Sequence, residues 1–194
     1  MLSARDPLPF RPQRVVVAGV SGVGKTTLAG RIARCLDVPH TEIDALYHGP
    51  DWVPRTEFLD DVRALVAQPA WVTEWQYSTA RPLLTERAEL MVWLDLPFAT
   101  VTLPRVIRRT VRRRLRREEL WNGNHEGPLH TLFTDREHII RWAISTRTKY
   151  RTRVPQADAD HPHLTVVRLR SRREVEHWLT GLREPSRGAN RQRG

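Results

Sequence analysis

Short runs of β-branched and other apolar residues alternate along the chain with segments in which apolar residues recur every three or four positions. The short runs have the length of buried strands, and the periodic segments have the repeat of an amphipathic helix. Five strands are predicted, at residues 14–18, 40–43, 71–73, 90–94 and 164–169. Strands that alternate with helices favour a parallel sheet covered on both faces, with right-handed crossovers. The predicted fold class is therefore α/β, with three layers.

The periodic segments between these strands predict the helices. They lie at residues 27–36, 56–67, 81–88, in an arginine-bearing stretch after the fourth strand, at 135–152 and after 171. Ser171 and Glu174 form a capping-box pattern, as do Thr134 and Glu137, so helices are expected to begin at both places.

The two ends of the chain lack this periodicity. Residues 1–13 carry three prolines, and residues 183–194 are rich in arginine, glycine and polar residues, so both are expected to be disordered. A single domain is predicted between them, at 14–182. No stretch reaches the ~18 apolar residues of a membrane span, and the N-terminus lacks a signal-peptide pattern. A cytoplasmic protein is therefore expected.

Residues 19–26 read Gly-Val-Ser-Gly-Val-Gly-Lys-Thr and fill every fixed position of the phosphate-binding P-loop. In such a loop the backbone N–H groups form an anion cradle, the lysine reaches the β- and γ-phosphates, and the threonine hydroxyl coordinates Mg²⁺. ATP and Mg²⁺ are the predicted ligands. The predicted nucleotide-binding residues here are Gly19, Ser21, Gly22, Val23, Gly24, Lys25, Thr26 and Thr27.

Further segments carry a resemblance to a family: Ile-Asp-Ala-Leu-Tyr at 43–47, Val-Trp-Leu-Asp-Leu-Pro at 92–97 and Leu-Trp-Asn-Gly-Asn at 120–124. Over residues 14–182 the chain resembles the adenylate-kinase-like P-loop family of bacterial topology modulation (FlaR-like) proteins. The resemblance implies the nucleoside-monophosphate-kinase fold, with strand order 2-3-1-4-5 and a helical lid inserted after the fourth strand, at about 105–152. It implies no particular acceptor. Residues 74–77 read Glu-Trp-Gln-Tyr, where the family usually has Asp-Gly-Asn-Tyr.

Carboxylates follow three of the predicted strands, at the edge of a parallel sheet where ligands bind. Asp44 is predicted to orient the acceptor and take its proton, with a helix-capping or turn aspartate as the alternative. Glu74 is predicted to hold magnesium together with Thr26, with an exposed strand-end glutamate as the alternative. Asp95 is a weaker candidate, because such an acid also serves as a hydrogen-bond acceptor behind the site.

Eight arginines fall between Arg105 and Arg117, several of them at helical spacings of three and four. A closing lid that brings Arg108, Arg109 and Arg112 over the transferred phosphoryl group would stabilise its charge, so these three are predicted to act in catalysis. A solvated basic face is the alternative.

Arg170 follows the last predicted strand, where the resemblance to kinases places the adenine, and is predicted to stack on it, with Arg172 or a plain turn as alternatives. The chain has a net charge of +10, which suits a phosphorylated substrate and weakly supports a nucleic-acid partner. A guanine-specific GTPase is disfavoured because neither lysine lies in an Asn/Thr-Lys-x-Asp element. The sequence therefore favours an ATP- and Mg²⁺-dependent phosphotransferase acting on a small acceptor. The alternative is an ATP-switched nucleic-acid-binding or regulatory ATPase.

Overall fold

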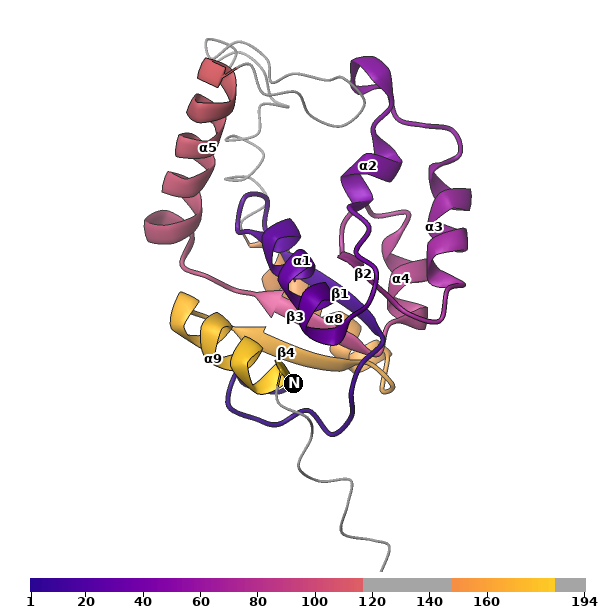
Figure 1. Ribbon diagram of the computed structural model, residues 1–194, viewed down its shortest axis with the longest axis vertical. Helices are drawn as coiled ribbons and strands as arrows, with labels where there is room; N and C mark the ends of the chain where they lie inside the picture. The colour runs from indigo at the N-terminus through magenta and orange to yellow at the C-terminus, as the bar shows by residue number, and fades with distance from the viewer. Residues whose placement is uncertain (117–147, 184–194) are drawn as a thin grey trace, which may run out of the picture.

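The computed structural model describes residues 1–116 and 148–183, and these form a parallel sheet with helices on both faces (Figure 1). The sheet order is β2-β1-β3-β4, and every pairing is parallel. The four strands are β1 (Arg14–Gly19), β2 (Trp71–Glu74), β3 (Leu90–Leu94) and β4 (Thr165–Leu169). The central strands are buried along their length because helices cover both faces, which explains their unbroken apolar runs.

Helices surround this sheet, most of them where the periodic segments predict, whereas α2 was not predicted. The described helices are α1 (Lys25–Leu36), α2 (Ile43–Tyr47), α3 (Phe58–Val66), α4 (Arg81–Arg87), α5 (Leu103–Arg116), α8 (Lys149–Asp160) and α9 (Arg172–Arg183), with a 3₁₀ turn at Pro50–Trp52 and a π turn at Phe98–Thr102. Helices α1 and α9 pack together over one face, whereas α4 and α8 contact β1 from the other. None of the described helices has the length and apolar run needed to cross a bilayer.

The expected strand at residues 40–43 does not form. His40 makes a single parallel bridge to Val72, and helix α2 begins directly afterwards, at Ile43. The Ile43 amide donates to the Glu74 carboxylate instead of to a neighbouring strand. The described sheet therefore has four strands and not five, because a buried side chain takes the place of the strand partner.

Residues 1–13 also differ from the disorder expected of them. Leu2 pairs with β4, donating to the Val166 carbonyl at 2.6 Å and accepting from the Arg168 amide at 2.9 Å, and Ala4 is buried. The segment thereby covers the edge of β4, an edge that would otherwise expose unpaired backbone groups.

Two prolines mark the helices that flank the undescribed residues 117–147. Pro104 lies in the first turn of α5, where its missing N–H costs nothing. Helix α8 contains Pro155 and extends to Asp160, beyond the predicted end at 152, because Val154 and Ala157 are buried in the core. Most of the predicted lid and residues 184–194 of the basic tail lie outside the described residues.

Candidate nucleotide and acceptor site

The P-loop joins β1 to α1 at the carboxyl edge of the sheet, and its conformation depends on glycine. Gly22 and Gly24 have φ of 76° and 109°, which side chains disfavour. A Cβ on Gly22 would lie 2.0 Å from Cγ2 of Val106, and one on Gly24 would lie 3.1 Å from the Arg105 guanidinium. The first turn of α5 therefore rests directly on the loop.

Lys25 begins helix α1, and its side chain is only 8% exposed. Its ammonium donates a long hydrogen bond of 3.4 Å to the Val20 carbonyl within the loop. An ammonium at this position in the loop provides the cation that a P-loop needs for triphosphate.

Glu74 ends β2 and is buried beside the start of α1 and α2. Its carboxylate accepts from the Ile43 amide at 3.0 Å and lies 3.4 Å from His40 Nε2. Burial opposes its ionisation, but the hydrogen bonds from His40, Ile43 and Thr26 outweigh burial and hold the pKa of Glu74 below its usual value. Thr26 contributes to this lowered pKa, so the structure places the predicted Thr26 near the Glu74 carboxylate.

Asp44 lies in the first turn of α2 and receives two hydrogen bonds on one oxygen. Gln76 Nε2 and the Tyr77 hydroxyl each donate to Oδ1 at 2.6 Å. Among the described residues, none donates to Oδ2. The carboxylate is therefore fixed in orientation, with one oxygen left for another ligand.

An aromatic cluster surrounds this carboxylate. The Tyr77 ring stacks on Tyr47 with centroids 3.9 Å apart, and the Tyr77 hydroxyl lies 3.2 Å from His48 Nε2. Burial, together with Asp44, raises the pKa of Tyr77 well above its usual value. Burial also lowers the pKa of His48, against the attraction of Asp44. Tyr77 therefore stays protonated at neutral pH, and His48 stays uncharged.

Trp75, the residue after Glu74, turns its ring into the core. Its ring is 4% exposed, and its Nε1 donates to Thr85 Oγ1 of α4 at 2.8 Å. The ring also meets Tyr150 of α8, edge to face, with centroids 6.1 Å apart. The side chain belongs to the core between the sheet, α4 and α8. Its neighbours in sequence, Gln76 and Tyr77, instead reach Asp44.

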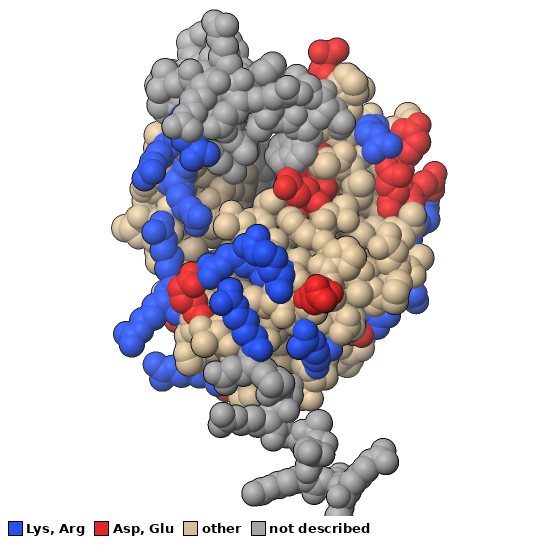
Figure 2. Space-filling model, viewed as in Figure 1, with Lys and Arg blue, Asp and Glu red and all other residues tan. Residues whose placement is uncertain are grey.

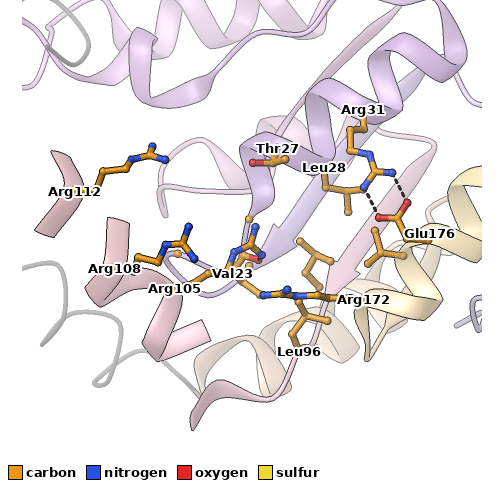
Figure 3. A pocket seen from close by; sticks show the side chains of 14 residues that line it. Val23, Thr27, Leu28, Arg31, Leu96, Arg105, Arg108, Arg112, Arg172 and Glu176 are labelled. Carbon is orange, nitrogen blue, oxygen red and sulfur yellow. Dashed lines mark hydrogen bonds and ion pairs between the residues drawn. The ribbon is translucent and has the colours of Figure 1, made fainter. Parts of the chain in front are cut away.

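A cavity of about 570 Å³ lies beside the P-loop, between α1, α5 and α9 (Figure 3). Arg108 and Arg112 of α5 line it from one side, and the paired Arg31 and Glu176 from the other. Arg105 anchors this wall by donating to the Val23 carbonyl at 3.0 Å. The cavity is thus basic and opens onto the loop that would hold phosphates.

The remaining predicted residues are placed as follows. Arg172 lines the cavity, whereas Arg170 does not and is exposed, with its amide donating to Glu174. Asp95 is paired with Arg168 of β4, which makes it an acceptor behind the site. The side chain of Arg109 lies outside the described part of the chain.

Sequence reasoning missed the polar partners of Asp44. Gln76, Tyr77 and His48 carry no motif of their own, although Tyr77 lies in the segment that resembles the family. Their placement follows from the stacking of α2 on the turn after β2, which periodicity does not report.

Charge divides across the visible face of the molecule. Figure 2 shows basic side chains gathered on the side of α5 and α9, and acidic side chains on the side of α2 and α3. The basic side coincides with the cavity arginines.

Comparisons with known proteins give a likeness of fold. No protein-family model and no curated protein matches the sequence. Among solved structures, the chain is similar to a gluconokinase from Sinorhizobium meliloti 1021 (22% identity, TM-score 0.49, covering 89% of this chain and 92% of that one) and to a shikimate kinase from Bacteroides thetaiotaomicron (14%, 0.49, 88% and 96%). It is also similar to a sugar kinase from Janibacter sp. HTCC2649 (24%, 0.44, 88% and 94%). Likenesses at this level carry no argument about the reaction, which rests on the residues of the site.

Proposed function

We propose that the protein is an ATP- and Mg²⁺-dependent phosphotransferase that acts on a small acceptor. The observation that carries this proposal is the position of Asp44, a carboxylate with one oriented and one available oxygen, at the same edge of the sheet as Lys25 of the P-loop. An ATP-binding site alone would need no such carboxylate.

The P-loop residues would bind the triphosphate. Its anionic oxygens would replace the Val20 carbonyl as the partner of the Lys25 ammonium, and the loop amides would bind the rest. Arg108 and Arg112 approach from α5, where they would stabilise charge on the transferred group, and Arg109 and Arg170 stay predictions.

Thr26 and Glu74 fit a magnesium site by the chemistry of their donors, since Mg²⁺ prefers hydroxyl, carboxylate and water oxygens and keeps much of its water. Among the described residues there is no cluster of three or more His, Cys, Asp or Glu side chains, so a water-rich site is the kind that this chain offers. When bound, Mg²⁺ would neutralise phosphate charge. Glu74 also holds the amide of Ile43 and thereby fixes the start of α2, next to Asp44.

Asp44 would take the proton of the acceptor. The acceptor oxygen forms a bond to the γ-phosphorus as the bond to the β–γ bridging oxygen breaks, and ADP leaves. Tyr77 and Gln76 hold Oδ1, so Oδ2 faces the acceptor and receives its proton.

The proposal is tested by measuring Mg-ATP binding and acceptor-stimulated ADP release with a panel of nucleoside monophosphates, sugar acids and alcohols. Lys25→Ala is expected to abolish Mg-ATP binding and ADP release. The fold, followed by circular dichroism, should stay intact. Equal ATP binding by the folded variant would refute the proposal. ATP hydrolysis that responds to DNA or RNA and to no small acceptor would favour the regulatory ATPase instead.

A further inference from the structure

Arg81 begins helix α4, just beyond the turn that follows β2. Its guanidinium lies over the ring of Trp75, 5.3 Å from the centroid. The side chain is half-buried, and its Nε is buried without a hydrogen-bond partner. A guanidinium normally compensates for lost water with an acid or several carbonyls.

Arg153 approaches the same place from helix α8. It lies three residues after Tyr150, on the same side of the helix. Tyr150 meets the Trp75 ring and donates to the Trp75 carbonyl at 3.3 Å. Burial, and the charge of Arg153, lower the pKa of Arg81. Arg81 and Arg153 are therefore close enough for their charges to interact.

No acid of the described residues neutralises this pair. Neither guanidinium takes part in an ion pair or hydrogen bond within residues 1–116 and 148–183. Elsewhere the chain pairs its partly buried arginines, as with Arg14 and Glu89 or Arg168 and Asp95. Two like charges without a counter-ion repel each other and favour an anion between them.

The pair also lies next to the acceptor side of the site. Gln76 and Tyr77, which hold Asp44, directly follow Trp75, and the Arg81 amide donates to the Tyr77 carbonyl at 3.1 Å. Burial raises the pKa of Tyr150, the charges of Arg81 and Arg153 oppose this shift, and the charge of Asp44 adds to it, so all three charged groups lie near the Tyr150 hydroxyl.

We propose that Arg81 and Arg153 form an anion subsite that binds the carboxylate or phosphate group of the acceptor whose reacting oxygen faces Asp44. The identification of the bound molecule as the acceptor rests on the proposed function. Anion binding by the two arginines does not depend on it. Uncharged alcohols and nucleosides are then poor acceptors.

Anion binding is tested first, with inorganic phosphate as the probe and with Lys25→Ala as the background that weakens the P-loop phosphate site. Titration of this variant is expected to show one phosphate site. Adding Arg81→Gln or Arg153→Gln should weaken that site about tenfold or more, as expected for a lost charged hydrogen bond. Adding Arg87→Gln, an exposed arginine of the same helix, should leave the site unchanged. Equal phosphate binding with and without Arg81 and Arg153 would overturn the subsite.

Arg81 also stacks on Trp75, so Arg81→Gln can fail to fold. Arg81→Lys and Arg153→Gln then carry the test, because lysine keeps the charge and Arg153 lies in another helix. Arg81→Lys is expected to keep part of the phosphate affinity. Full loss of the site in Arg81→Lys with full retention in Arg153→Gln would refute a shared subsite.

The acceptor class is tested with matched pairs on the wild-type chain: gluconate against sorbitol for a carboxylate, and AMP against adenosine for a phosphate. The anionic member of one pair should stimulate ADP release, and Arg81→Gln should raise its KM about tenfold or more with little change in the KM for ATP. Equal use of the neutral members would overturn the assignment. If phosphate binds as expected but no acceptor stimulates ATP turnover, the anion subsite is supported and the proposed phosphotransferase function is refuted.

Discussion

Tyr77 donates a hydrogen bond of 2.6 Å to Asp44, and it does so from a left-handed backbone conformation with φ of 56°. Such a conformation costs free energy for a tyrosine, so surrounding contacts must maintain it. The stack on Tyr47 and the contact with His48 supply them. The chain thus holds the orientation of one carboxylate at the expense of local strain, which favours a role for Asp44 in function over a simple cap.

Asp44→Asn should separate transfer from nucleotide binding. The amide keeps the size of the side chain but cannot accept a proton, so transfer should fall by roughly 10²- to 10⁴-fold while ATP affinity stays near wild type. Steady-state kinetics and ATP titration measure the two effects. Asp60→Asn, on the exposed face of α3, is the matched control. Unchanged transfer in Asp44→Asn would make Asp44 a structural residue.

Gly22→Ala should disturb the P-loop through α5. The new Cβ meets Val106 Cγ2 at 2.0 Å, and φ of 76° is unfavourable for alanine, so we expect a loss of about 1–3 kcal/mol in stability and weaker ATP binding. Chemical denaturation measures the first effect. Val106→Ala in the same chain should recover part of the loss.

Gly181→Ala is the control for this substitution, since nothing lies within 4 Å of its Cβ and it belongs to helix α9. It should stabilise the protein by about 0.4–1 kcal/mol. A Gly22→Ala variant as stable as wild type would show that α5 does not rest on the loop.

His48 should make stability depend on pH. Its pKa in the folded state lies below the unfolded value of about 6.5, so the unfolded chain binds the proton first as pH falls. The contribution of neutral His48 to the free energy of unfolding is therefore complete above the unfolded pKa, and it is lost as pH decreases toward the folded pKa. His48→Gln should reduce the slope of unfolding free energy between about pH 7.5 and 5. An identical slope in both proteins would contradict the buried, neutral His48.

Arg108→Ala and Arg112→Ala should lower kcat with little change in ATP affinity, because charge on α5 matters most where it develops during transfer. The expected cost is about 2–4 kcal/mol in the barrier for a preorganised donor. Arg173→Ala, an exposed arginine of α9 outside the cavity lining, is the control. Near-wild-type kcat in both α5 variants would assign these arginines to a solvated face.

The sequence by itself determined the features that depend on neighbours along the chain. The P-loop is one, because glycines before a lysine at the start of a helix specify the loop locally. The cap of α9 is another, since Glu174 donates its amide to Ser171 Oγ at 3.1 Å as the pattern predicts. Buried strands β1, β3 and β4 were predicted for the same reason, from runs of apolar residues.

The tertiary structure alone decided which polar groups meet. Residues 40–43 had the composition of a strand, but the buried Glu74 carboxylate takes the Ile43 amide and starts a helix there. Trp75 stood as a departure at the acceptor site, yet its ring turns into the core while Gln76 and Tyr77 reach Asp44. The hydrogen bonds to Glu74 and Asp44 join residues more than thirty positions apart, and the one that fixes Trp75 joins residues ten apart. No local pattern of hydrophobic and polar residues records these contacts.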